Sequence, residues 1–166
     1  FLHNKKILEK ICRIQDLNNK HVVEVGPGKG FLTEFLLKEN PKNLTVIEKD
    51  KRLKPFLEKI KKRYPNKLHI LFDDALKLDL TNLTKNKIIL VGNLPYNIAT
   101  TLILNWIRLN KNITSLVLMI QKEVAQRLYA KAGTSFYSRI SVLIQANATV
   151  TEKIEVSSEN FFPKPK

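Results

Sequence analysis

The hydrophobic positions along the chain follow two alternating periods. Short, mostly apolar runs of four or five residues occur at 22–25, 44–47, 68–72, 88–91 and 116–120. Between these runs, apolar residues recur at three- and four-residue spacing, the period of a helix with one buried face. The helical stretches cover residues 7–17, 31–36, 54–60, 98–107 and 124–128. The alternation predicts an α/β fold with a mostly parallel sheet and helices on both faces.

Three segments of this pattern are less regular. Pro55 lies in the third helical stretch, and proline is tolerated only in the first turn, so we expect that helix to begin near Lys54. Residues 140–148 fit either a helix or a strand by periodicity alone. Residues 154–156 are a candidate for a short sixth strand.

A glycine-rich loop follows the first predicted strand. Parallel sheets bind ligands beyond the carboxyl ends of their strands, so the loops there carry the most information. Gly26, Gly28 and Gly30 have G-x-G-x-G spacing, whereas the dinucleotide fingerprint is G-x-G-x-x-G. This spacing disfavours a nicotinamide site and suits a nucleoside without a pyrophosphate, such as S-adenosylmethionine (SAM). A purely structural turn is the alternative.

Carboxylates follow the second and third predicted strands. Glu48 stands about 20 residues after the glycines, where an acid can accept both ribose hydroxyls of a nucleoside. Asp73 and Asp74 come next. One of them can accept the amino group of adenine, while the other caps a helix or faces solvent.

The most specific feature is the loop Asn93-Leu94-Pro95-Tyr96 after the fourth predicted strand. The exocyclic nitrogen of adenine is a poor nucleophile because its lone pair is delocalised into the ring. The Asn93 side-chain oxygen and the Leu94 carbonyl could hold both amino hydrogens and turn the lone pair toward an electrophilic methyl group. Pro95 stiffens the loop, and Tyr96 offers a face for base stacking.

Composition indicates one globular domain. The 166 residues are 43% hydrophobic, enough for a core without disulfides, and the single cysteine, Cys12, excludes an intrachain disulfide. No apolar run approaches the roughly 20 residues that cross a bilayer. We therefore expect a cytoplasmic protein without a membrane partner.

The net charge of +14 points to a polyanionic partner such as nucleic acid. Of the 29 basic residues 23 are lysine, so a compositional drift toward lysine also fits. The densest basic stretch, residues 49–67, is either a phosphate-tracking surface beside the site or an ordinary solvated helix face.

Together these motifs resemble the ribosomal RNA adenine N6-dimethyltransferase family of the KsgA/RsmA type. The resemblance covers nearly the whole chain in seven ordered blocks. These are residues 1–2, 23–30, 46–50, 74–75, 92–98, 121–125 and 161–166.

The resemblance implies a class I SAM-dependent methyltransferase (Rossmann-like) fold and an enzyme of ribosome biogenesis and rRNA processing. Its expected reaction is dimethylation at N6 of two adjacent adenosines near the 3′ end of small-subunit (16S) rRNA. The implied cofactor is SAM, with S-adenosylhomocysteine as product and no metal. The implied partner is the 30S particle, bound by a monomer.

The family's positions also imply roles for individual residues, which fall into two sets. The cofactor contacts are Leu2, Gly26, Gly28, Glu48, Asp74 and Asn93. The catalytic and adenine-binding residues are Asn93, Leu94, Pro95, Tyr96 and Phe161, the last as a second stacking face. The family further makes 138–148 a helix.

Some features depart from the family. Ser138 replaces a usual glycine, and the chain opens at the phenylalanine of the family's first motif. We expect residues 1–166 to be the catalytic domain without its last strand and C-terminal helical domain. Three alternatives stay open: a large-subunit (23S) rRNA dimethyltransferase of the macrolide-resistance type, a non-catalytic nucleic-acid-binding relative, and a nicotinamide dehydrogenase.

Overall fold

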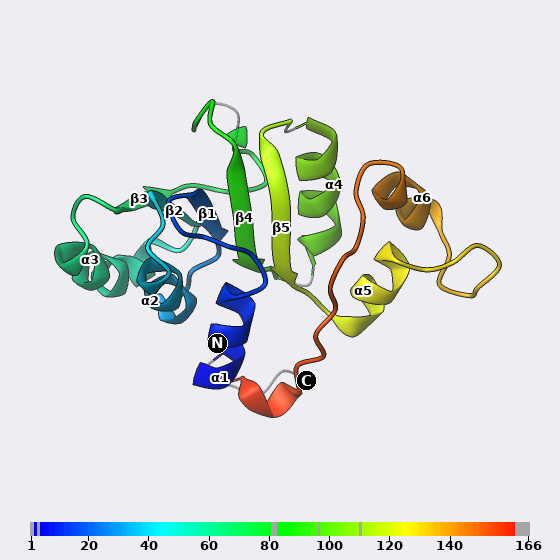
Figure 1. The fold of residues 1–166 in the computed structure, drawn as a ribbon, viewed down its shortest axis with the longest axis horizontal. Helices are drawn as coiled ribbons and strands as arrows, with labels where there is room; N and C mark the ends of the chain where they lie inside the picture. Colours follow the sequence, from blue (N-terminus) through cyan, green and yellow to red (C-terminus); the bar gives the residue numbers. More distant parts are fainter. Residues whose placement is uncertain (1, 3, 81–82, 96, 110, 162–166) are drawn as a thin grey trace.

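Five parallel strands form one sheet in the computed structural model, which describes residues 2, 4–80, 83–95, 97–109 and 111–161. The strands are β1 (His21–Val25), β2 (Asn43–Glu48), β3 (Leu68–Phe72), β4 (Ile88–Asn93) and β5 (Ile113–Met119). Their order across the sheet is β3-β2-β1-β4-β5, and every pairing is parallel (Figure 1). All five predicted strands are confirmed. Strands β2 and β3 lie on one side of β1, and β4 and β5 lie on the other. Sheets of this kind bind ligands at the point where the strand order reverses, which here lies between β1 and β4.

Helices cover both faces of the sheet. They are α1 (Lys5–Cys12), α2 (Phe31–Lys38), α3 (Lys54–Arg63), α4 (Ala99–Leu109), α5 (Lys122–Leu128) and α6 (Arg139–Gln145). The described residues also form two short 3-10 helices, η1 (Lys51–Leu53) and η3 (Ser158–Asn160).

Successive residues of a strand point to opposite faces, so each strand contributes to two cores. Val22 packs with α1, α2 and α3, whereas its neighbour Val23 packs with α4 and α6. The predicted helices on both faces are therefore confirmed.

The start of α3 is confirmed and the end of α1 is not. Pro55 lies in the first turn of α3, after η1. The first helix ends at Cys12 rather than near residue 17. Asp16 accepts the backbone N–H of Asn18, and such a local side-chain bond competes with helix continuation. Leu17 is nevertheless 3% exposed. The apolar spacing therefore continues to residue 17 because Leu17 is buried, although the helix has already ended.

The segments after α5 give one confirmed and one wrong prediction. Residues 139–145 are helical, as the family resemblance implied, and the Ser138 N–H donates to Ser141 Oγ at the helix start. The predicted strand at 154–156 is wrong, because these residues pair with no strand in the described part of the chain. Val156 packs on the core, while Glu155 forms an ion pair with Lys122. Apolar and polar residues therefore alternate as in a strand, although these residues form no strand-to-strand hydrogen bonds with other described residues.

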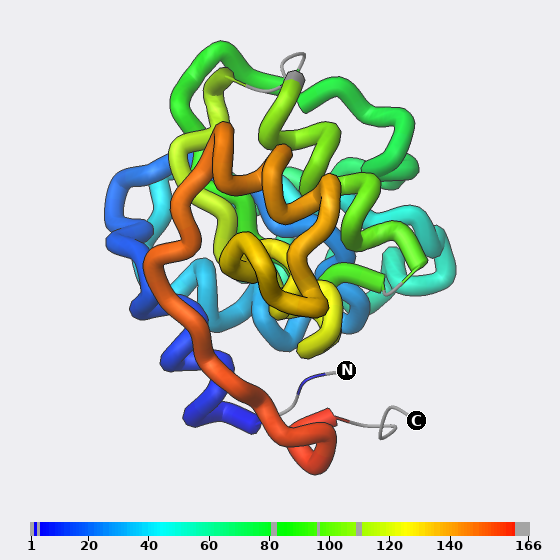
Figure 2. Tube along the Cα trace, turned by 90° about the vertical axis from the view of Figure 1, so that its right-hand side faces the viewer, coloured from blue at the N-terminus to red at the C-terminus, as the bar shows by residue number. Residues whose placement is uncertain are grey.

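The last described residues return to the start of the chain. The extended segment after α6 runs past α5 to η3, beside α1 (Figure 2). Leu2 and Phe161 form an antiparallel bridge there. Two residues at opposite ends of the described chain thus reach one place.

Candidate active site at the strand ends

The glycine loop after β1 is shaped by its neighbours. Gly26, Gly28 and Gly30 all have positive φ, between 60° and 83°, a region that side chains rarely adopt. A Cβ on Gly30 would lie 2.2 Å from Ile60 Cδ1 of α3. A Cβ on Gly26 would lie 3.4 Å from the Asn93 carbonyl oxygen. The loop therefore lies directly against the end of β4 on one side and α3 on the other.

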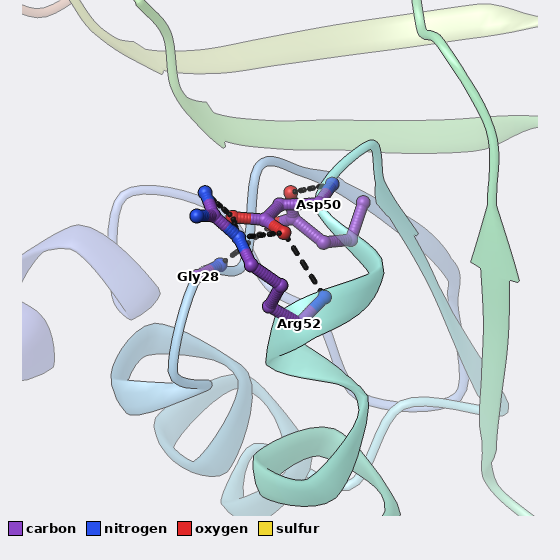
Figure 3. Close-up of polar contacts among 4 residues, drawn as sticks. Gly28, Asp50 and Arg52 are labelled. Atoms are coloured by element: carbon purple, nitrogen blue, oxygen red, sulfur yellow. Dashed lines mark hydrogen bonds and ion pairs between the residues drawn. The ribbon is translucent and has the colours of Figure 1, made fainter.

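Glu48 joins the end of β2 to this loop. Its carboxylate accepts the Gly28 N–H at 3.1 Å and the Asp50 N–H at 2.9 Å, and the residue is 8% exposed. Figure 3 shows how Gly28, Asp50 and Arg52 gather around this point. The carboxylate is fixed by the backbone, and its remaining lone pairs can accept ligand hydroxyls.

Asp50 and Arg52 form a second, exposed pair at the same turn. Arg52 Nη2 lies 2.7 Å from Asp50 Oδ2, and Asp50 also caps the backbone N–H of Arg52. The side-chain hydrogen bond from Arg52 lowers the pKa of Asp50 below its ordinary value. The turn after β2 therefore has a defined shape.

Asp74 follows β3 as a half-buried carboxylate. Its Oδ1 accepts the Leu76 N–H at 3.0 Å, and its Oδ2 lies 2.9 Å from Lys49 Nζ. The hydrogen bond from Lys49 lowers the pKa of Asp74, so it stays an acceptor at neutral pH. Asp73 is exposed and accepts the Asp74 N–H, which makes it the solvent-facing member of the pair.

Asn93 and Leu94 lie where β4 meets β5. Asn93 pairs with Met119, and the Leu94 N–H donates to the Met119 carbonyl at 3.0 Å. The Leu94 side chain is 1% exposed and packs in the core. The Pro95 carbonyl accepts from Ile98 and Ala99 and starts α4. Tyr96 lies outside the described residues.

A cleft that is partly open to solvent lies at the carboxyl ends of β1 and β4. It brings together three predicted residues, Leu2, Gly26 and Asn93. The other lining residues were not predicted from the sequence. They are Leu8, Glu24, Pro27, Phe31, Leu32 and Met119. Phe161 reaches the same region through its bridge to Leu2.

Glu24 is the main residue that sequence reasoning missed. It is 1% exposed, and Thr33 Oγ1 donates to its Oε2 at 2.7 Å. Burial raises the pKa of its carboxyl to about 8. The available signal was an acid inside an otherwise apolar strand. A buried acid that stays protonated at neutral pH therefore borders the cleft.

Within the described ranges, no three His, Cys, Asp or Glu side chains are placed to hold a metal ion. None of the helices there is long and apolar enough to cross a membrane.

Comparisons with known proteins agree with this geometry. The sequence model of a family described as "Ribosomal RNA adenine dimethylase" matches residues 1–166. The chain is 40% identical over 169 residues to a protein of Pelagibacter ubique named "Ribosomal RNA small subunit methyltransferase A", covering all of this chain and 63% of that protein. Its identity to a protein of the same name from Ehrlichia ruminantium is 41%, covering 64% of that protein.

Solved structures show the same fold. A dimethyladenosine transferase from Plasmodium falciparum superposes with a TM-score of 0.89 at 32% identity, over all of this chain and 59% of the other. The 23S rRNA methyltransferase ErmE gives 0.82 at 28% identity, over all of this chain and 65% of the other. The chain thus spans less than two thirds of each of these relatives.

Proposed function

The chain belongs to the ribosomal RNA adenine dimethylase family, and from this membership we propose that it transfers methyl groups from SAM to N6 of two adjacent adenosines near the 3′ end of small-subunit rRNA. The observation that carries the proposal is the placement of Asn93 at the cleft, beside Gly26 and Leu2. In such a site a polar amide and a glycine loop face the same small space.

The residues at the strand ends fit SAM. Glu48 is a fixed acceptor for ribose hydroxyls, because two backbone N–H groups already hold it. Asp74 is a charged acceptor for the adenine amino group. Leu2 and Gly26 border the space for the rest of the molecule. When bound there, SAM supplies an electrophilic methyl group next to a good leaving group.

Asn93 and Leu94 carry the chemistry of the target adenine in this proposal. The Asn93 amide oxygen and the Leu94 carbonyl accept the two amino hydrogens and localise the nitrogen lone pair. Neither group bonds to another described residue. Backbone bonds from Leu94 to Met119 and from α4 to Pro95 hold the loop, so positioning supplies much of the rate enhancement. Tyr96 and Phe161 are proposed to stack on the base.

The small subunit is the proposed target because the relatives at 40% and 41% identity carry small-subunit names, whereas the structure of the 23S enzyme is 28% identical. The proposed partner is therefore the 30S particle, in the cytoplasm, and the proposed state is a monomer. The activity of the longer relatives is a proposal for this chain, which covers 63% of the first of them.

Labelled-methyl transfer tests the proposal. We expect label from SAM in undermethylated 30S particles, at two adjacent adenosines, and Asn93→Ala should abolish transfer while leaving much of the SAM binding. Asn147→Ala, an exposed site in the turn after α6, is the matched control. Label in 50S particles alone would move the assignment to the large subunit. SAM binding without transfer to either particle would favour the non-catalytic alternative.

A further inference from the structure

Two segments from opposite ends of the chain meet at the cleft. Leu2 lines the cleft, is 5% exposed, and forms an antiparallel bridge with Phe161. Phe161 is half-buried and packs against the core cluster that contains Leu2. In both views α1 and the red segment that contains η3 lie next to each other (Figures 1 and 2). The bridge is one pair of described residues, and a side-chain hydrogen bond next to it also joins the two segments.

A pair of asparagine side chains forms this hydrogen bond. Asn4 Nδ2 donates to Asn160 Oδ1 at 2.6 Å, across 156 residues of sequence. Asn4 Oδ1 caps α1 by accepting the N–H of Lys6 and Ile7. Asn160 Nδ2 donates to the Ser157 carbonyl at 3.0 Å. In both side-chain amides the NH2 group donates a hydrogen bond and the oxygen accepts one. Rotating either amide by 180° would exchange the two groups and break these bonds. We call the Asn4–Asn160 hydrogen bond the clasp.

The approach to Asn160 has little other support. Among the described residues, 149–156 make no backbone hydrogen bonds. Lys122 and Glu155 form an ion pair, but the two side chains are 68% and 83% exposed, and exposed pairs contribute little. Val156 and Phe161 add apolar contacts. In the described part of the chain, the clasp is the side-chain hydrogen bond that joins this segment to the start of α1.

We propose that Asn4 and Asn160 are positioning residues that couple the cofactor side of the site to the adenosine side. The inference rests on the proposed function, in which Leu2 contacts SAM and Phe161 stacks on the target base. A ligand that orders Leu2 also orders Phe161 through the bridge and the clasp. By linkage, cofactor and RNA then strengthen each other's binding by the same factor.

Two substitutions of the same type separate the clasp from the local roles of its residues. Asn4→Asp keeps the oxygen that caps α1 but loses the donor to Asn160. Asn160→Asp keeps the oxygen that accepts from Asn4 and loses only the donor to Ser157. Each adds one negative charge. Asn4→Asp breaks the clasp, Asn160→Asp retains it, and Asn147→Asp repeats the charge change after α6.

The test measures the affinity of a short RNA hairpin with two adjacent unpaired adenosines, with and without saturating S-adenosylhomocysteine. One net hydrogen bond contributes about 1 kcal/mol, which is a factor of about five in an equilibrium constant. We therefore expect saturating S-adenosylhomocysteine to lower the dissociation constant of the RNA about fivefold in the parent chain. The same factor should appear in Asn160→Asp and Asn147→Asp. In Asn4→Asp it should fall to less than about twofold, with α1 still helical by circular dichroism.

Binding of S-adenosylhomocysteine alone, measured by calorimetry, keeps the two proposals apart. If the parent chain binds it and Asn4→Asp shows undiminished coupling, the clasp has no positioning role and the proposed function stands. Absence of coupling in the parent chain also overturns the inference. A parent chain that does not bind the nucleoside overturns the proposed function and the coupling together. Loss of hydrogen-exchange protection at the Phe161 amide, which donates to the Ser158 carbonyl, in Asn4→Asp alone is the second expected result.

Discussion

At the scale of single residues, the raised pKa of Glu24 makes the stability of the folded protein depend on pH. Its pKa is about 8 in the folded protein and 4.5 as an ordinary glutamate. Between these values the unfolded chain has lost the proton and the folded chain keeps it, so stability falls as pH rises from 4.5 to about 8 and then levels. Below pH 4.5 both states are protonated and this destabilisation is absent.

Glu24→Gln removes this dependence. Glutamine cannot ionise, and its amide oxygen can still accept from Thr33. We expect the free energy of unfolding of the variant to rise relative to the parent chain between pH 5 and pH 8, by about 3–4 kcal/mol. Urea unfolding of both proteins at the two pH values measures it. Glu152→Gln removes an exposed acid as the control, and parallel curves for Glu24→Gln would contradict the assignment.

Gly30 is required for two separable reasons, its positive φ of 83° and the 2.2 Å approach of a Cβ to Ile60 Cδ1. Gly30→Ala should destabilise by about 2–3 kcal/mol, from backbone strain and overpacking together. Gly133 has φ of 84° and no atom within 4 Å, so Gly133→Ala isolates the backbone cost at about 1 kcal/mol. Ile60→Val removes Cδ1 and should recover part of the Gly30→Ala loss in the double variant. Strictly additive effects would show that the close approach to Ile60 is not responsible.

At the scale of elements, strands were predictable and element ends were not. Buried parallel strands are apolar on both faces, which leaves a short, unmistakable run such as 88–91. The end of α1 depends on a local competition between Asp16 and the helix, and the apolar spacing continues through it. Residues 154–156 show alternation because Val156 packs inward, although no partner strand lies beside them in the described structure.

The candidate site was predictable where it depends on strand ends. Gly26, Glu48, Asp74 and Asn93 each follow or end a strand, so topology alone brings them to one edge of the sheet. The Asn4–Asn160 hydrogen bond was not predictable, because it depends on the path of the segment after α6. The sequence shows Glu24 as an acid within a strand. Its hydrogen bond to Thr33 of α2 depends on how α2 packs on the sheet, which the sequence does not show.

The basic face of α3 is the element most suited to RNA phosphates. Lys54, Lys59 and Lys62 are exposed on a helix that packs against the glycine loop, whereas Arg63 is already paired with Glu34. Reversing the three lysines to glutamate should weaken rRNA binding and flatten its salt dependence. The slope of log K against log salt should fall by roughly 0.7–0.9 for each phosphate that the variant no longer neutralises.

A matched control lies at the opposite edge of the sheet. Lys85 and Lys87 precede β4 and Lys111 precedes β5, and all three are exposed. Their reversal changes the net charge by the same amount at the amino ends of the strands. If both triple variants lower the slope equally, the effect is one of total charge, and α3 has no special role.

At the scale of the whole molecule, the site joins paired strands of the sheet to the first and last described segments of the chain. It takes residues from the ends of β1, β2 and β4, from the loop before α1, and from the last described segment. The cleft is lined by Leu2, Leu8 and Leu32 of the core that packs α1, α2 and α3, and β1 joins this core to the other one. Binding should therefore stabilise the folded molecule as one unit and should be visible in global unfolding.

S-adenosylhomocysteine at about 100 times its dissociation constant should add about 3 kcal/mol to the free energy of unfolding. For a chain of this size, that corresponds to a rise in Tm of roughly 6–11 °C. NAD is the informative comparison, since it carries the same adenosine and a pyrophosphate that the G-x-G-x-G loop does not favour. Thermal unfolding followed at 222 nm with each nucleotide distinguishes the two. A shift with NAD equal to that with S-adenosylhomocysteine would mean that the site recognises adenosine alone, and the case for a methyl-transfer site would lose its structural basis.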